Sequence, residues 1–95
     1  MNLGKIFMTC GVEYEIKEGN IKLLDLCNFI EKFKDNNWGE LCDSDKKYQN
    51  NLMDKGDTEY PYMGSYITNN IKIWLMKGID SKLGHYTTIM LPEEY

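Results

Sequence analysis

The clearest pattern in the chain is helical and lies in its first half. From Ile21 onward, apolar residues recur at spacings of three and four, with charged or amide side chains between them. The apolar members are Ile21, Leu24, Cys27, Phe29 or Ile30, and Phe33. Asn20 is a suitable N-cap, so we predict a helix from Asn20 to about Lys34. Leu23 and Leu26 widen the apolar stripe, which predicts packing against more than one element.

A second and thinner apolar pattern follows. Asp43 or Ser44 can cap a helix that runs to about Lys55, and Gly56 stands where a helix commonly stops. The apolar face of this helix consists of Leu41, Tyr48 and Leu52, with Met53 as an optional fourth member, so we expect it to be partly exposed. Between the two helices, residues 38–41 (WGEL) predict a tight turn.

Four stretches favour strands because β-branched and aromatic residues are concentrated in them. They are residues 5–9 (KIFMT), 62–68 (YMGSYIT), 71–76 (IKIWLM) and 86–91 (YTTIML). The pair Asn69-Asn70 is typical of a hairpin turn, Pro61 suits a strand entry, and Pro92 ends the last strand. Residues 12–19 are charged and are interpreted as a connection, with extended structure as an option. Residues 77–85 are predicted to form a loop.

The predicted elements follow the order β-α-α-β-β-β within a single domain of residues 1–95. Consecutive strands with short connections favour antiparallel pairing. We therefore predict the α+β class, as a two-layer domain with an antiparallel sheet and two helices on one face. A chain of 95 residues and 11.2 kDa supports one small core.

The alternation of residues 71–76 suggests how this sheet is oriented. If the helices cover the face that carries Ile71, Ile73 and Leu75, then Lys72, Trp74 and Met76 point outward. Three residues of the last strand, Tyr86, Thr88 and Met90, would share that outer face. The alternative is the reverse register, which would place Trp74 in the core.

Composition and charge narrow the classes of function. The formal charge is −4, and all 11 basic residues are lysines. Arginine is the usual bidentate ligand of phosphate and of guanine, so its absence argues against direct binding of nucleic acid. The mean hydropathy is −0.53 and no apolar run approaches a membrane span, so we expect no membrane association. The first eight residues do not resemble a signal peptide.

The candidates for chemistry are few. The three cysteines, Cys10, Cys27 and Cys42, lack CxxC spacing, which favours reduced thiols and a cytoplasmic location. Together with His85, the single histidine, they fit no known zinc motif. Asp43 and Asp45 are more simply explained by helix capping than by acid–base chemistry, and no nucleotide-binding glycine motif is present. We therefore expect no cofactor, no metal and no enzymatic activity.

Aromatic and acidic residues are the remaining candidates for contact with a partner. Aromatic residues make up 13% of the chain, and such residues are enriched in the cores of protein interfaces. The predicted contact residues are Trp38, Glu40, Asp43, Asp45, Tyr62, Tyr66 and Trp74. For each aromatic residue, the alternative is that it fills the core of a small domain.

Several short motifs resemble a family of small, mostly uncharacterised proteins described as plasmid-related and carried by bacterial mobile elements. They are residues 9–12 (TCGV, where the family has TRGV), 38–42 (WGELC, family WGDLC) with Asp45-Lys46, Met53 and Gly56, Tyr66, 72–75 (KIWL, family IWI) and 87–95 (TTIMLPEEY, family TTxLxPEEY). Cys10 replaces the family's arginine, and Asp80-Ser81 replaces its Asp-Arg pair within a longer loop. The closing motif is the most specific.

The resemblance implies a setting on mobile elements, where small acidic proteins commonly block host defence. We therefore expect an inhibitor that binds a protein stoichiometrically, with a CRISPR effector or a restriction enzyme as partner. An acidic surface can compete for a basic nucleic-acid channel. The alternative is a protein that binds or sequesters a signalling nucleotide at an oligomer interface. A homodimer remains open in either case.

Overall fold

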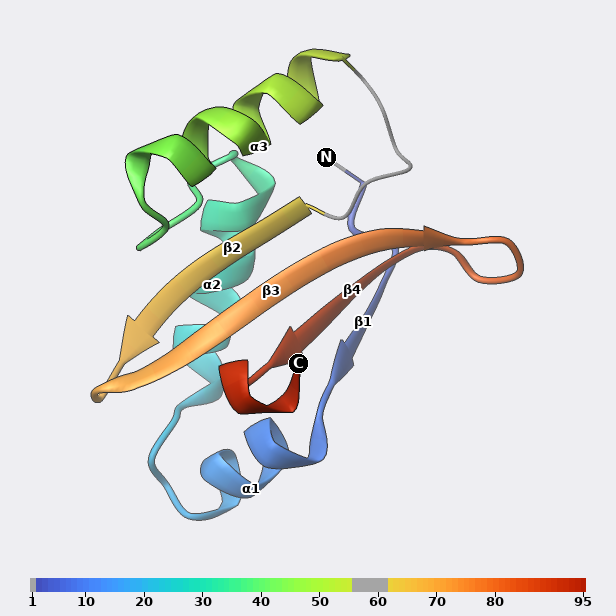
Figure 1. Ribbon diagram of the computed structural model, residues 1–95. Coiled ribbons are helices and arrows are strands. Elements are labelled where there is room, and N and C mark those ends of the chain that lie inside the picture. The colour runs from blue at the N-terminus through green and yellow to red at the C-terminus, as the bar shows by residue number, and fades with distance from the viewer. Residues whose placement is uncertain (1, 56–61) are drawn as a thin grey trace.

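The computed structural model describes residues 2–55 and 62–95, and it has the predicted α+β class (Figure 1). The strands are β1 (Lys5–Met8), β2 (Tyr62–Thr68), β3 (Ile71–Asp80) and β4 (Gly84–Met90). The helices of the described residues are α1 (Cys10–Lys17), α2 (Leu23–Lys34), α3 (Asp43–Lys55) and the short 3-10 helix η1 (Pro92–Glu94). The expected roles of Gly56 and Pro61 lie outside the described residues.

The sheet is mixed, not wholly antiparallel as predicted. Its strand order is β1-β4-β3-β2, in which β2, β3 and β4 form an antiparallel meander. The edge strand β1 pairs in parallel with β4, from Lys5 opposite Tyr86 to Met8 opposite Ile89. Helices α1, α2 and α3 lie between β1 and the meander along the chain, and so long a crossover lets β1 run parallel to a strand that is distant in sequence.

Helix α1 occupies a segment that the sequence indicated to be a connection. Thr9 is its N-cap, and the Thr9 hydroxyl accepts a hydrogen bond from the Val12 N–H at 3.5 Å. Val12 is fully buried, and Ile16, one turn later, packs against the core. Glu13 in the first turn and Lys17 in the last turn both suit the helix dipole. A short apolar stripe of two residues was therefore sufficient for a helix.

The predicted loop at residues 77–85 is shorter in the structure. Strand β3 continues to Asp80 and β4 begins at Gly84. The Asp80 carboxylate closes the intervening turn, because its Oδ1 accepts hydrogen bonds from the backbone N–H of Lys82 at 2.7 Å and of Leu83 at 3.0 Å. These bonds hold the pKa of Asp80 below its ordinary value.

The core lies between α2 and one face of the sheet, the inner face. Ile73 and Leu75 of β3 are fully buried there, and Phe33 of α2 is equally buried. Figure 1 shows α2 running behind the sheet and α3 lying beyond the β2 edge. In the described part of the chain, no α-helix covers the opposite face, which we call the outer face. Both α2 and α3 thus contribute to the core, but only α2 forms the predicted helical layer across the sheet.

Candidate functional site

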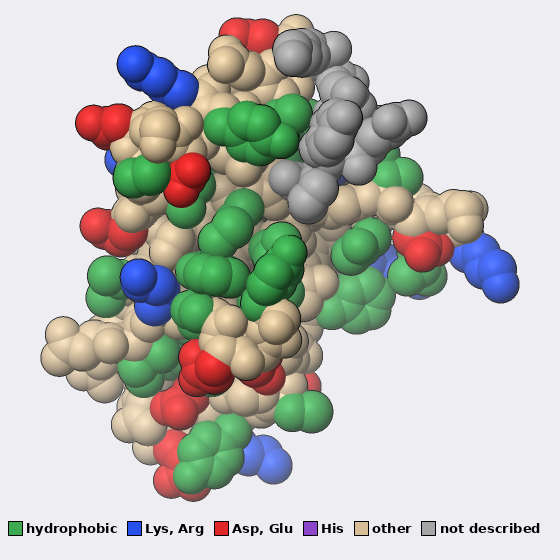
Figure 2. All heavy atoms as spheres, viewed as in Figure 1, with side chains coloured by type: hydrophobic (Ala, Val, Ile, Leu, Met, Phe, Trp, Pro, Cys, Tyr) green, Lys and Arg blue, Asp and Glu red, His purple; other side chains and the backbone are tan. Residues whose placement is uncertain are grey.

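The outer face carries the side chains that the alternation of residues 71–76 assigned to it. Trp74 and Met76 are half-buried, whereas their neighbours Ile73 and Leu75 are fully buried on the inner face. The strand register adds residues from the other three strands to Trp74 and Met76. The added residues are Phe7, Met63, Tyr86, Thr88 and Met90. Of the two registers that the sequence left open, the structure has the one with Trp74 on the outer face. Figure 2 shows hydrophobic side chains gathered over the middle of the sheet on this face.

Tyr95 belongs to this surface, although it was not among the predicted contact residues. Its ring packs edge-on against Trp74, with 5.9 Å between centroids and 66° between planes. Tyr95 is 81% exposed, so the pair remains accessible. The signal available in the sequence was an aromatic residue placed a few positions after the last predicted strand.

Glu94 fixes the segment that carries Tyr95. Its Oε1 accepts hydrogen bonds from the Thr9 hydroxyl at 2.5 Å and from the Leu91 N–H at 2.9 Å. Its Oε2 accepts from the Gly11 N–H at 3.0 Å, at the start of α1. The Thr9 bond, followed by the backbone bonds, lowers the pKa of the Glu94 carboxyl. The TCGV and PEEY motifs therefore meet in space at one carboxylate.

A groove of about 480 Å³ lies between α3 and the outer face. Trp74, Met63, Ser65 and Lys72 come from the sheet, and the remaining lining residues come from α3 and the segment before it. Those remaining residues are Glu40, Leu41, Cys42, Asp45, Tyr48 and Gln49. The groove thus brings together three of the predicted contact residues, Glu40, Asp45 and Trp74. Asp43 is exposed at the start of α3 and does not line the groove.

Backbone pairing with β2 places Glu40 beside the groove. The Ser65 N–H donates to the Trp38 carbonyl at 3.0 Å, and the Glu40 N–H donates to the Ser65 carbonyl at 2.6 Å. Gly39 lies between these bonds with φ of +72°, and a Cβ built there would stand 2.0 Å from the Ser65 oxygen. Only glycine allows so close an approach in this conformation.

The other three predicted aromatic residues are part of the core, as the alternative interpretation allowed. Trp38, Tyr62 and Tyr66 are each at most 4% exposed. Tyr62 and Tyr66 lie opposite Lys77 and Ile73 on the inner face. Their surface exposure is too small for a contact with a partner in this conformation.

The polar atoms of these three aromatic side chains are bonded inside the domain. Trp38 Nε1 donates to Asn50 Oδ1 at 2.9 Å, and the Tyr66 hydroxyl donates to the Asn37 carbonyl at 2.7 Å. The Tyr62 hydroxyl donates to a backbone carbonyl of α3 at 3.3 Å. Burial also raises the pKa of Tyr66. Trp38 and Tyr62 therefore bond to α3, whereas Tyr66 bonds to the segment that precedes it.

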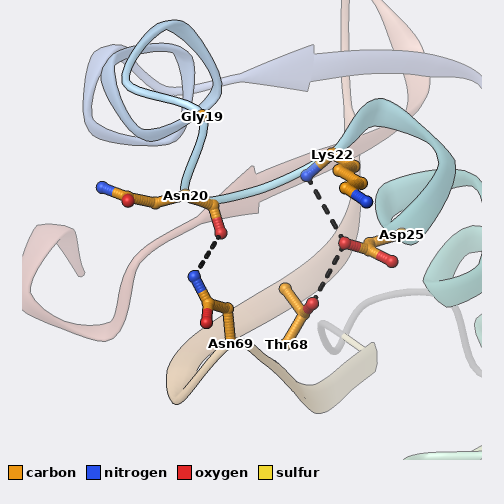
Figure 3. Close-up of a pocket in the computed structure, with 6 residues that line it drawn as sticks. All are labelled: Gly19, Asn20, Lys22, Asp25, Thr68 and Asn69. Carbon is orange, nitrogen blue, oxygen red and sulfur yellow. Dashed lines mark hydrogen bonds between the residues drawn. The ribbon is translucent and has the colours of Figure 1, made fainter.

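A separate polar pocket of about 470 Å³ lies between the α1–α2 connection and the β2–β3 turn (Figure 3). Asp25 Oδ2 accepts hydrogen bonds from the Thr68 hydroxyl at 3.0 Å and from the Lys22 N–H at 3.4 Å. Asn69 Nδ2 donates to the Asn20 carbonyl at 3.1 Å. These bonds hold the hairpin against the start of α2, so the polar groups of the pocket serve the fold.

The residues weighed for metal chemistry lie apart. Cys10, Cys27 and Cys42 are exposed free thiols. His85 Nδ1 lies 3.0 Å from the Nζ of Lys77, which is buried. Across residues 2–55 and 62–95, no three His, Cys, Asp or Glu side chains are grouped so that they could hold a metal ion. None of the helices described there has the length and apolar character needed to cross a membrane.

Comparison of the chain with protein-family models, with curated proteins and with solved structures finds no match.

Proposed function

We propose that this protein is a small inhibitor that acts by stoichiometric binding to a protein, and that its partner is a nucleic-acid-handling defence complex, either a CRISPR effector or a restriction enzyme. The observation that carries this proposal is the Trp74–Tyr95 pair, which stands on a sheet face without a helical layer in the described residues. Large aromatic side chains in partly desolvated settings are the residues that most often dominate protein interfaces.

The composition of the outer face supports binding to a protein. Met63, Met76 and Met90 lie on the same face as the aromatic pair, and flexible thioether side chains adapt well to a partner surface. Exposed apolar patches rimmed by polar groups commonly mark interaction sites. The acidic side chains near the groove and the net charge of −4 favour a basic partner surface, such as one that binds nucleic acid. The resemblance to mobile-element proteins supports the same setting.

The test is a cleavage assay with purified CRISPR effectors and restriction enzymes. We expect DNA cleavage to decline linearly with added protein and to stop near an equimolar ratio. The double variant Trp74→Ala/Tyr95→Ala should weaken inhibition at least about tenfold, because both anchors are removed. Tyr14→Ala is the matched control, since Tyr14 is 57% exposed and belongs to α1, not to the sheet.

Two results would contradict the proposal. One is complete inhibition at far less than one equivalent, which would indicate turnover. The other is the absence of any effect on these enzymes together with the absence of a defence complex in affinity purifications from a bacterial host. The alternative hypothesis, sequestration of a signalling nucleotide, is tested by thermal denaturation with a panel of nucleotides, because a bound ligand raises the melting temperature.

A further inference from the structure

We propose that the groove between α3 and the outer face receives the side chain of an arginine carried by a basic segment of the partner. This inference rests on the proposed function, because it names the chemistry that the same surface recognises. It concerns the groove alone, so it can be tested without knowing the identity of the partner.

Trp74 provides a flat surface for a guanidinium group. Its side chain lines the groove and is half-buried, and its ring is held by the contact with Tyr95. Guanidinium is planar, weakly hydrated and delocalised, and it stacks on indole more readily than other cations do. A held, partly desolvated indole therefore favours arginine over lysine.

Two carboxylates lie in the same groove on the side of α3. Glu40 is positioned by the backbone pairing with Ser65, and Asp45 lies in the first turn of α3. Neither has an ion-pair partner among the residues that the structure describes. Carboxylates accept the paired N–H groups of a guanidinium in a bidentate geometry. Because the chain contains no arginine of its own, such a group must come from another molecule.

Gln49 ties the two sides of the groove together. It lines the groove and is only 6% exposed, and its Oε1 accepts a hydrogen bond from the Met63 N–H at 3.1 Å. This bond joins α3 to β2, so the side chains on α3 are held opposite those of the sheet.

Lys72 also lines the groove, and its positive charge opposes the attraction that the two carboxylates exert on a cation. Its ammonium group repels an incoming cation, so the groove is a compromise between two acidic side chains and one basic side chain. This arrangement makes the proposal sharply testable, because the removal of charges of opposite sign must change binding in opposite directions.

The experiment is an NMR titration of the full chain with short capped peptides that carry one arginine, one lysine or one citrulline between glycines. The chain has two indole N–H signals. That of Trp74 reports the groove, whereas that of Trp38, buried and bonded to Asn50, reports the integrity of the fold. We expect the arginine peptide to shift the Trp74 signal with millimolar affinity. The lysine peptide should bind about threefold more weakly, and the citrulline peptide should have no effect.

Charge variants complete the test. Glu40→Gln and Asp45→Asn should each weaken binding of the arginine peptide about threefold, and Lys72→Gln should strengthen it about twofold. Asp54→Asn is the matched control, because it removes the same charge from α3 outside the groove lining. An unchanged Trp38 signal confirms that each variant is folded.

The inference is overturned if arginine and citrulline peptides act alike, if lysine binds as well as arginine, or if the charge variants behave like Asp54→Asn. A Trp74 signal that moves with protein concentration alone would instead indicate that a second copy of the chain occupies the groove. Arginine binding without inhibition of any defence enzyme would leave this inference standing while the proposed function fails. Inhibition without arginine binding would support the proposed function and overturn this inference.

Discussion

Thr9 and Glu94 are 85 positions apart in the chain, yet the Thr9 hydroxyl donates a hydrogen bond of 2.5 Å to Glu94 Oε1. Thr9 is the N-cap of α1, and Glu94 supplies a second acceptor at the same helix start through Gly11. The residue that follows, Tyr95, packs against Trp74 on the outer face. One carboxylate therefore stabilises a helix and also positions an aromatic ring of the candidate interaction surface.

Replacement of Glu94 by glutamine should destabilise the fold. The amide keeps the size of the side chain but removes the charge and one acceptor oxygen at the start of α1. We expect the free energy of unfolding to fall by about 1 kcal/mol, as measured by urea denaturation. Glu93→Gln is the control, since no hydrogen bond joins Glu93 to another described residue, and it should change stability little. Equal effects of the two substitutions would contradict the assigned role of Glu94.

The same carboxylate should make stability depend on pH in the acid range. The pKa of Glu94 in the folded protein lies below its ordinary value of 4.5, because the Thr9 hydroxyl and two backbone N–H groups stabilise the charged form. The unfolded chain therefore binds a proton first as the pH falls. The contribution of Glu94 is fully present above about pH 5 and is lost as the pH falls through the folded-state pKa. Urea midpoints of the parent and of Glu94→Gln should converge as the pH falls below the folded-state pKa of Glu94, whereas a constant difference would contradict this assignment.

The sequence predicted those parts of the fold that depend on neighbouring positions. The regular apolar spacing from Ile21 to Phe33 predicted the existence of α2, although the helix begins at Leu23 with Lys22 as its N-cap in place of Asn20. Leu24 and Cys27 of the predicted apolar face are exposed. The alternation around Trp74 divided the strand residues between two faces and left open which face points outward. Helix α1 was missed because only Val12 and Ile16 mark its apolar face, and because part of its cap comes from Glu94 at the other end of the chain. The parallel pairing of β1 with β4 is equally distant in sequence, so no local pattern reports it.

The candidate site was predictable only in part, for the same reason. Local alternation placed Trp74 on the same face as Lys72 and Met76, and the packing of the opposite face against α2 makes this face the outer one. Glu40 and Asp45 join it because residues 38–40 pair with β2, an arrangement that depends on Gly39 and Ser65 together. Tyr62 and Tyr66 looked suitable for a surface contact by residue type. Their places in the core follow from the register of β2 with β3, which the sequence alone does not specify.

The effect of Gly11→Ala on the free energy of unfolding should change sign when Glu94 is replaced by alanine. In most helix interiors, alanine is about 1 kcal/mol more favourable than glycine. Here a Cβ at position 11 would stand 2.7 Å from the Glu94 carboxylate and would displace it from the hydrogen bonds that it accepts. We expect Gly11→Ala to destabilise the parent by about 1 kcal/mol and to stabilise a Glu94→Ala variant. Urea denaturation of the four proteins measures this, and stabilisation in both backgrounds would rule out the coupling.

Gly39→Ala should disrupt the wall of the groove. Position 39 has φ of +72°, and the added Cβ would overlap the Ser65 carbonyl oxygen, which belongs to the rigid backbone of β2. We expect a loss of about 3 kcal/mol or more, seen as a lower melting temperature or as failure to fold. Gly19→Ala is a matched control, because Gly19 has φ of +77° but nothing within 4 Å of the added atom. That variant should lose only about 1 kcal/mol. Similar losses for both would indicate that backbone strain, not the contact with Ser65, dominates.

Lys77→Met should stabilise the protein near neutral pH. Lys77 is 3% exposed, and its ammonium lies 3.0 Å from His85 Nδ1 and 5.5 Å from the centre of the Tyr62 ring. Burial lowers the pKa of Lys77 from its ordinary value of 10.5, so the folded state disfavours the charged form. Because the unfolded chain holds the proton more tightly, the stability of the parent rises as the pH approaches 10.5. We expect Lys77→Met to gain about 1 kcal/mol at neutral pH, and this gain should shrink as the pH rises. Urea denaturation between about pH 7 and pH 10 measures the difference, and a gain that grows with pH would show that the ammonium stabilises the fold.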